Sequence, residues 1–370
     1  MSTSAKQDSE STQSRLASLD ALRGFDMFWI MGGDHLVHVA ALGTGWAWLA
    51  AASGQLKHAV WAGVHVYDLV FPLFMFLSGV SLTLSMEQGR MASDGKTAAI
   101  GRAARRAAIL VVLGIIYNFG WSLDPAKFRV ASVLGQIGIA YLIAAAVLVF
   151  LDRWLWRAVA LAAILLTVAT LQLWIPVPGH GAGVLTPVGI VNGWIDRAFL
   201  PGRLYGGSYD PEGILSTFSG AAVTLSGAFA GALLLQSPSS AARTPILLAF
   251  AGTASIAAGA LIAPYYPPIK AVWTVTFDLL AAGASMLLFA FFLYVIDVMR
   301  WRRWSFFFVV IGVNSIAIYM TARFVAYPLF AMIKDLALAP ALAILLIAAV
   351  TGLHWLALWV LYRKKLFLRV

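Results

Sequence analysis

Long apolar runs that carry almost no charge recur along this chain, and they constrain its fold more than any other feature. Each run is long enough to cross the roughly 30 Å hydrocarbon layer of a bilayer as an α-helix. Helices are expected because an open sheet cannot pair its backbone polar groups in lipid. Only 11% of the 370 residues are charged, whereas a soluble protein averages about 25%. We therefore predict an all-α, polytopic integral membrane protein.

About ten of these runs qualify as transmembrane helices. The predicted spans lie near 21–40, 67–86, 100–119, 131–151, 156–176, 213–235, 244–263, 271–296, 305–323 and 340–362. The segment 324–335 is apolar but short, and we predict an interfacial or re-entrant helix there. Ten spans put both termini on one side of the membrane. With that side inside, eighteen of the 26 Lys and Arg residues are cytoplasmic, which predicts an N-in, C-in topology by the positive-inside rule.

The chain is predicted to hold one membrane domain. Residues 1–19 are polar and rich in Ser and Thr, so we expect a disordered cytoplasmic tail. Residues 20–370 form a single transmembrane domain, whose largest outer loops are 41–66 and 177–212. The net charge of +10 is explained by cytoplasmic loops and requires no nucleic acid. The lack of Cys excludes disulfides and thiolate catalysis, and the HLVH stretch at 35–38 lacks a third ligand, so no metal site is predicted.

A His and an Asp stand at the entrance to the second predicted span. His58 opens the stretch HAVWAGVHVYDLVFP, and Asp68 follows ten residues later. An imidazole titrates near working pH and can serve as a general base or an acyl acceptor, and a carboxylate can orient it. His65 is a weaker competitor for this role. The alternative is an interfacial His58 beside the aromatic residues Trp61 and Tyr67, and composition alone leaves both interpretations open.

Two further acids, Asp26 and Asp34, interrupt the first predicted span. Charge at membrane depth is costly and is usually functional. The two carboxylates lie roughly 12 Å apart along a helix and can line one polar seam. The structural alternatives are ion pairs, Asp26 with Arg23 and Asp34 with His38. Asp278 and Asn314, in later spans, are expected to hold helices together through hydrogen bonds.

Basic residues cluster in two predicted cytoplasmic segments. One contains Arg102, Arg105 and Arg106, and the other is the run WRRW at 301–304. They are either ordinary positive-inside loops or a clamp for the phosphates of a cytoplasmic nucleotide, which Arg binds in bidentate fashion. The chain has no Walker or GxGxxG motif to support a nucleotide. The residues therefore leave two classes open, a transporter and a membrane-embedded transferase.

Several motifs resemble those of one known family. They are RLASLDALRG at 15–24, the block that begins at His58 and continues through DLVFPLFMFLSG, FRVASVLGQIGIAYL at 128–142, YDPEGILSTFSG at 209–220, PPIKAVWTVTF at 267–277 and IGVNSIAIY at 311–319. These motifs, in the same order, resemble those of the heparan-α-glucosaminide N-acetyltransferase family. That family includes bacterial membrane proteins linked to N-acetylglucosamine use. The resemblance identifies the domain at 20–370 as a transmembrane acyltransferase.

The resemblance implies transfer of an acetyl group from cytoplasmic acetyl-CoA to an amino sugar on the far side of a bacterial inner membrane. It places the catalytic His of the family on His58 and the acid of its DLVFP motif on Asp68. Asp34 stands where the animal enzyme has an Asn near its active site, so we include it among the catalytic residues. Besides the acceptor sugar, membrane lipid is the expected partner, and a homodimer is left open.

Two sets of binding residues complete the hypothesis. The proposed ligands of the CoA phosphates are Arg102, Arg105, Arg106, Arg129 and Arg303. The proposed acceptor-site residues are Asp26, Asp210, Glu212 and Asn314. The competing interpretation is a permease for N-acetylglucosamine or its oligomers, in which Asp26, Asp34 and Asp278 line a transport path.

Overall fold

A computed structural model describes residues 16–86, 95–121, 124–236 and 242–368 of the chain. Most of the predicted N-terminal tail therefore lies outside the described residues. Within them the chain is helical, and its β contacts are isolated bridges. The α-helices are α2 (Ala17–Phe28), α3 (Asp34–Thr44), α4 (Ala47–Gln55), α5 (Val70–Ser85), α6 (Gly95–Phe119), α7 (Val133–Phe150), α8 (Trp154–Trp174), α9 (Val191–Phe199), α10 (Ile214–Leu235), α11 (Arg243–Ile262), α12 (Val275–Leu293), α13 (Phe306–Gly312), α14 (Ser315–Thr321), α15 (Tyr327–Asp335) and α16 (Pro340–Arg363).

Shorter turns of other helix types connect or extend these helices. The π-helical segments are η1 (Trp29–Gly33), η6 (Tyr294–Val298) and η7 (Ala322–Ala326), and the 3₁₀ turns are η2 (Val66–Leu69), η4 (Pro125–Lys127) and η5 (Lys270–Val272). Two of the π segments interrupt long helices, where a single-turn bulge often marks a functional site. The segment η1 joins α2 to α3, and η7 joins α14 to α15.

The predicted all-α membrane fold is confirmed. Eight helical segments are long and apolar enough to cross a membrane: Val66–Ser85, Val133–Phe150, Trp154–Trp174, Ile214–Leu235, Arg243–Ile262, Val275–Val298, Ser315–Asp335 and Pro340–Arg363. Two other long segments, α6 and the rod from α2 through α3, carry more charged residues. The count of ten spans therefore stays a prediction.

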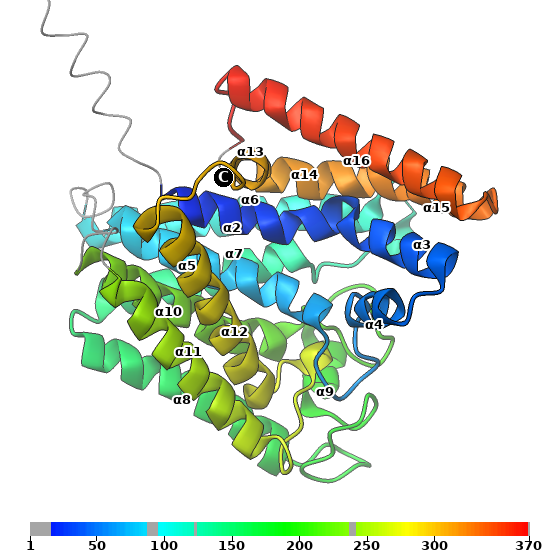
Figure 1. Ribbon diagram of the computed structural model, residues 1–370. Helices are drawn as coiled ribbons and strands as arrows, with labels where there is room; N and C mark the ends of the chain where they lie inside the picture. Colours follow the sequence, from blue (N-terminus) through cyan, green and yellow to red (C-terminus); the bar gives the residue numbers. More distant parts are fainter. Residues whose placement is uncertain (1–15, 87–94, 122–123, 237–241, 369–370) are drawn as a thin grey trace, which may run out of the picture.

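Successive long helices run in alternating directions, so the connecting segments gather at two ends of the bundle (Figure 1). One end, here called the loop end, holds the segments 45–69, 124–132, 175–213 and 263–274. These segments bond to one another: Gly63 N–H donates to the Pro268 carbonyl at 2.9 Å, and Arg203 N–H donates to the Phe128 carbonyl at 2.8 Å.

The opposite end, here called the terminal end, holds the start of α2 and the end of α16 (Figure 1). Both described ends of the chain thus lie on the same side of the bundle. This arrangement is compatible with the predicted N-in, C-in topology. Because the same bundle can insert either way up, the orientation stays a prediction.

The centre of the bundle is built on close contact between α5 and α10. A Cβ atom added to Gly79 would lie 1.8 Å from the Thr224 carbonyl oxygen, and one added to Gly227 would lie 1.9 Å from the Phe76 carbonyl oxygen. Small residues allow membrane helices to approach in this way. As a result α10 is central, with 78% of its span buried, whereas α8 is peripheral, with 11% buried.

Several predicted boundaries need correction. The segment 324–335 is wrong as a separate short helix, because α14, η7 and α15 form one helix from Ser315 to Asp335. Its proline, Pro328, stands in the first turn after η7, where a missing backbone N–H is tolerated. The first helix begins at Ala17 rather than after residue 19. The predicted loops 41–66 and 177–212 contain the helices α4 and α9.

Candidate active site

His58, Asp68 and Lys270 form a compact polar triangle at the loop end. The His58 Nδ1 atom lies 2.7 Å from Asp68 Oδ1 and 2.9 Å from Lys270 Nζ. Lys270 Nζ lies 3.4 Å from the same Asp68 oxygen. The Asp68 side chain is buried, whereas 54% of the His58 side chain is exposed. The triangle is therefore anchored inside the protein and open toward the loops through the imidazole.

Asp68 is held by the backbone of the segment that precedes it. Its Oδ2 atom accepts hydrogen bonds from the N–H groups of Ala59, at 3.2 Å, and His65, at 2.9 Å. The His65 ring bonds instead to the Lys57 carbonyl oxygen, at 2.9 Å. This assigns the two candidate histidines different positions: His58 contacts the acid through its ring, and His65 orders the loop that carries the acid.

Lys270 is the member of the triangle that the sequence analysis missed. It lies in the motif PPIKAVWTVTF, between α11 and α12, and starts the turn η5. Burial lowers the pKa of its amine, and the neighbouring carboxylates of Asp68 and Glu212 oppose that shift. The available signal was a lysine within one of the family-like motifs, in the short segment between the predicted spans 244–263 and 271–296.

Asp34 lies next to this triangle but does not bond to it. Its carboxylate accepts a hydrogen bond from the Tyr67 hydroxyl at 3.2 Å and lies 2.8 Å from His35 Nδ1. The Tyr67 ring in turn lies 5.0 Å from the His58 ring, centroid to centroid. The predicted pair of Asp34 with His38 is wrong, because the His38 ring bonds to Ser53 Oγ at 2.8 Å.

The position of Asp34 depends on the π segment just before it. Gly32, in η1, has a φ of 140°, a backbone conformation that only glycine adopts readily. A Cβ at this position would also lie 2.5 Å from Thr351 Oγ1 and 2.9 Å from the Phe330 ring. The kink therefore needs glycine, and it turns the start of α3 so that Asp34 faces Tyr67.

Asp26, one turn before η1, is buried in α2. Its Oδ2 atom has no hydrogen-bond partner among the described residues. Arg23, the predicted ion-pair partner, contacts Asp20 at 3.4 Å and also bonds to Ser81. Asp26 lies within electrostatic reach of Tyr67, so its proposed role at the acceptor site stays open.

Arg129, Asp210 and Glu212 form a second charged cluster at the loop end. Arg129 donates to the two Asp210 oxygens, at 2.7 and 2.5 Å, and also to Glu212. Asp210 is fully buried, and it also accepts the N–H groups of Tyr205 and Glu212, each at 3.0 Å. Burial raises the pKa of Glu212, and the Arg129 charge opposes that shift.

Two predicted site residues in this cluster, Arg129 and Asp210, have their side chains engaged by the protein itself. Asn118, near the end of α6, donates to the Arg129 carbonyl oxygen at 3.0 Å. Arg129 therefore lies at the opposite end of α6 from Arg102 and Arg106, roughly 20 Å away along the helix. Its guanidinium is engaged by the carboxylates of Asp210 and Glu212, away from the other proposed phosphate ligands. Asp210 likewise has its oxygens committed to the protein, whereas Glu212 also faces Lys270.

A buried acid holds the YDPEG segment against α10. The Asp196 carboxylate accepts the N–H groups of Ile214, at 3.0 Å, and Asp210, at 3.1 Å. A Cβ on Gly213 would lie 2.2 Å from one of its oxygens. Burial raises the pKa of Asp196 to about 6, against the effect of these hydrogen bonds. Asp196 thereby fixes where Glu212 points.

The remaining predicted ligands lie at the terminal end. Arg102, Arg105 and Arg106 occupy the first half of α6, and the Arg106 guanidinium stacks 4.2 Å over the Tyr141 ring. Arg303 follows α12 at the same end and is exposed. These residues stay predicted phosphate ligands, separated from His58 by the thickness of the bundle.

Asn314 also lies at the terminal end, away from the His58 triangle. Its side-chain amide donates to the Leu366 carbonyl at 3.3 Å, and its oxygen accepts the Leu368 N–H at 3.0 Å. Both groups are thus used to hold the segment after α16. They lie across the bundle from His58, so they cannot contact a sugar bound there.

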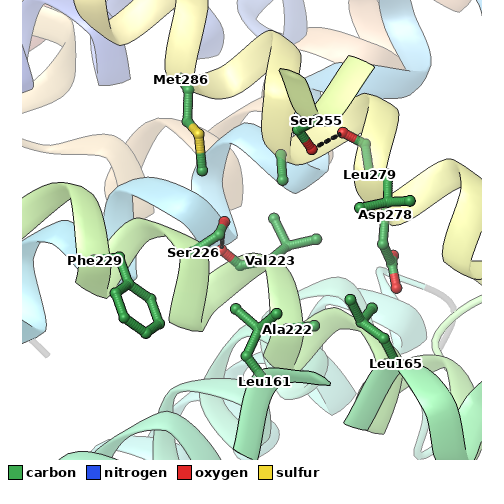
Figure 2. A pocket seen from close by; sticks show the side chains of 11 residues that line it. Leu161, Leu165, Ala222, Val223, Ser226, Phe229, Ser255, Asp278, Leu279 and Met286 are labelled. Atoms are coloured by element: carbon green, nitrogen blue, oxygen red, sulfur yellow. Dashed lines mark hydrogen bonds between the residues drawn. The ribbon is translucent and has the colours of Figure 1, made fainter. Parts of the chain in front are cut away.

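A separate apolar cavity of about 190 Å³ lies between α8, α10, α11 and α12 (Figure 2). Leu161, Phe229 and Met286 line it, and Asp278 lies at its edge (Figure 2). The Asp278 carboxylate is 2.5 Å from Ser219 Oγ on α10, as expected of a hydrogen bond between helices. This cavity is distinct from the His58 triangle.

The geometry of the triangle suits proton transfer and nucleophilic chemistry. Asp68 fixes the Nδ1 side of His58, and among the described residues Nε2 has no hydrogen-bond partner. A base oriented by a carboxylate is the usual arrangement for activating a nucleophile. Such a group can take a proton from an incoming amine or accept an acyl group itself.

Comparisons with known proteins agree with this chemistry. The acyltransferase domain family matches residues 16–359. Heparan-alpha-glucosaminide N-acetyltransferase of Mus musculus is 28% identical over 426 aligned positions, which cover 97% of this chain and 61% of that protein. The protein of the same name from Homo sapiens is 28% identical over 416 positions, which cover 96% of this chain and 60% of that protein. The chain thus spans about three fifths of the length of the curated relatives it matches.

Proposed function

The chain belongs to the acyltransferase domain family, and on that premise we propose that it is a membrane N-acetyltransferase that moves acetyl from acetyl-CoA to the amine of a glucosamine-type sugar. The observation that carries the proposal is the His58–Asp68 pair. Its 2.7 Å contact orients an imidazole whose side chain is 54% exposed. The names of the mouse and human relatives, which state N-acetyl transfer and a glucosaminide, support the same transferred group and acceptor class.

The proposed reaction uses His58 at the thioester carbonyl. The sugar amine attacks the carbonyl carbon, the N–C bond forms, and the C–S bond breaks. His58 Nε2 takes the proton that the amine loses and returns it to the departing thiolate. In a two-step route, Nε2 first attacks the carbonyl, and the C–S bond breaks to release the thiolate of CoA. The sugar amine then attacks the acetyl-imidazole, the Nε2–acetyl bond breaks, and Nε2 takes the proton that the amine loses. Asp68 holds the ring tautomer and stabilises the imidazolium.

The two ends of the bundle suggest how the substrates approach. The Arg residues at 102, 105, 106 and 303 lie at the terminal end, where the positive-inside rule expects the cytoplasm. They are proposed to bind the CoA phosphates through charge-assisted hydrogen bonds. The acetyl group would then reach His58 at the loop end, on the periplasmic side of a bacterial inner membrane.

The acceptor amine is proposed to bind near acids that remain accessible from the triangle. Asp34 is connected to His58 through Tyr67, and Glu212 faces Lys270. Either carboxylate can attract the ammonium form of the sugar before it loses its proton. Asp26 is a deeper candidate, since one of its oxygens lacks a partner among the described residues.

The permease alternative needs Asp26, Asp34 and Asp278 along one path. The structure places Asp34 beside Tyr67, whereas Asp278 bonds to Ser219 and borders the apolar cavity (Figure 2). The three acids therefore do not share a common set of contacts. No observation in the described part of the chain favours transport over transfer.

The test is turnover of labelled acetyl-CoA by purified protein in detergent, with glucosamine as acceptor. We expect labelled N-acetylglucosamine from wild type and none from His58→Ala, whereas His180→Ala, which changes an exposed histidine at the same end, remains active. Normal turnover by His58→Ala would reject the assigned role of His58. Acetyl-CoA binding without transfer would reject glucosamine as the acceptor, and no binding would reject the transferase itself.

A further inference from the structure

Two polar atoms lie close to a single ring nitrogen of His58. Asp68 Oδ1 lies 2.7 Å from His58 Nδ1, and Lys270 Nζ lies 2.9 Å from the same atom. In the plane of the imidazole, this nitrogen carries either one hydrogen or one lone pair. The two neighbours therefore make competing demands on it, and only some protonation states satisfy both.

The Asp68 contact requires the hydrogen. An ionised carboxylate is only an acceptor, so a bare Nδ1 would place two lone pairs 2.7 Å apart. With Nδ1–H pointing toward Asp68, an ammonium at Lys270 would bring three further hydrogens against it. An uncharged amine instead offers a lone pair to the same Nδ1–H. The contacts of Nδ1 are thus all favourable when Lys270 is neutral.

We propose that Lys270 is a positioning residue that serves His58 as an uncharged amine, keeping the ring proton on Nδ1 and Nε2 free to act as the base. The inference rests on the proposed transferase function. When Nε2 takes the proton of the acceptor amine, Nδ1–H is shared between Asp68 and the Nζ lone pair, which stabilises the imidazolium. A charged Lys270 would place a second positive charge 2.9 Å from that ring and oppose its formation.

The surroundings of Lys270 support a neutral amine. Only 19% of its side chain is exposed, and burial lowers the pKa of the amine. The groups that face it are Asp68 in the turn η2, His58 in the loop before that turn and Glu212 just before α10. The two carboxylates favour the charged form of Lys270. Glu212 is itself bonded to Arg129, however, which reduces its stabilisation of the Lys270 ammonium.

The activity test compares two replacements at one position. Lys270→Met is uncharged, and Lys270→Arg retains the charge and cannot lose it. We expect Arg to lower kcat/KM for acetyl transfer by at least about 100-fold at every pH, and Met to lower it less. In a plot of kcat/KM against pH, the acidic side of the Lys270→Met curve should lie at lower pH than that of wild type, because protonation of Lys270 no longer inhibits the enzyme. A structural ion pair would reverse the order, with Arg more active than Met.

The chain contains no Cys, which permits a sharper version of this test. Lys270→Cys can be alkylated at that single thiol with bromoethylamine, which rebuilds the side chain with a less basic amine. We expect activity to return with its acid limb shifted to lower pH than that of wild type. Alkylation of the same thiol with a reagent that attaches a permanently charged trimethylammonium group should not restore activity. Equal rescue by both reagents would overturn the proposal.

A second measurement does not depend on turnover. Competitive labelling of wild-type amines with acetic anhydride across a pH series, read by mass spectrometry, reports the protonation of each lysine. We expect Lys270 to become reactive at lower pH than Lys57, an exposed lysine at the same end. If the two lysines titrate together, the proposal fails whether or not the chain is a transferase. If Lys270 titrates early but no acetyl is transferred, only the proposed function fails.

Discussion

The hydroxyl of Tyr67 donates a hydrogen bond of 3.2 Å to Asp34, and this contact joins the first helical rod to the segment that carries the catalytic candidates. The Tyr67 ring also lies 5.0 Å from His58. A carboxylate from α3 is thereby brought beside an imidazole from a distant loop. The contact explains how an acid within the first predicted span can belong to the same site as His58.

Removing the charge of Asp34 should weaken binding of the acceptor. Asp34→Asn retains an oxygen for the Tyr67 hydroxyl but loses the attraction for an ammonium. A hydrogen bond to a charged group is worth about 1.5–3 kcal/mol, so we expect KM for the amino sugar to rise about 10- to 100-fold, with kcat affected less. Tyr67→Phe is the matched control, because it removes the hydrogen bond but not the charge. Steady-state kinetics with glucosamine would contradict the assignment if only kcat changed in Asp34→Asn.

Asp68 and His58 should act as a unit. Asp68→Asn replaces the acceptor for Nδ1–H with an amide that can also donate, so it permits the wrong tautomer. We expect kcat to fall by about 100-fold or more. The double variant Asp68→Asn/His58→Ala should be no slower than His58→Ala alone, since Asp68 then has no imidazole left to orient. Additive losses in labelled acetyl transfer would show that the two residues work independently.

Arg129 should matter for stability more than for catalysis. Arg129→Ala would leave the buried carboxylate of Asp210 uncompensated, and breaking such a pair typically costs about 3–5 kcal/mol. We expect a clear loss of thermal stability in detergent. Arg203→Ala, in the neighbouring loop, is the control, because its exposed side chain can be removed while its backbone bond to Phe128 remains. Similar melting of the two variants would contradict the structural role of the cluster.

Asp196 should make stability depend on pH. Its folded-state pKa is raised to about 6 by burial, above its unfolded value near 3.9. Between these values the folded state binds more protons than the unfolded state, so stability falls as pH rises from about 4 to about 6 and levels off above it. The full change corresponds to about 3 kcal/mol. Unfolding of Asp196→Asn, measured across this range, should lack that slope. A slope equal to that of wild type would refute the assignment.

Local patterns predicted much of the fold. Apolar runs of membrane-spanning length gave helices, because lipid offers no partner to backbone polar groups. The break assigned before residue 324 failed because the π segment η7 continues the helix past Arg323 and Pro328. Such a bulge adds a residue to a turn without a distinct apolar pattern. The same holds for η1, whose kink at Gly32 positions Asp34.

The candidate site was likewise predictable where its residues are close together in the sequence, and unpredictable where they come from distant segments. His58 and Asp68 are ten residues apart in one motif, and a short loop brings them together. The motifs grouped Asn314 with the acceptor site and Arg129 with the other arginines, but a motif does not reveal which end of a helix a residue occupies. Asn314 contacts the segment after α16, and Arg129 contacts Asp210. Those partners depend on which helices are neighbours.

By itself, the sequence determined that this protein is a helical membrane protein with a His–Asp pair at the mouth of a span. Both conclusions depend on residues close together in the chain, where backbone hydrogen bonding and loop length leave few alternatives. The tertiary structure alone decided that Lys270, 212 residues from His58, completes the triangle. The loop that carries His58 meets the loop that carries Lys270 through a backbone hydrogen bond from Gly63 N–H to the Pro268 carbonyl, and only the packing of the helices brings these two loops together.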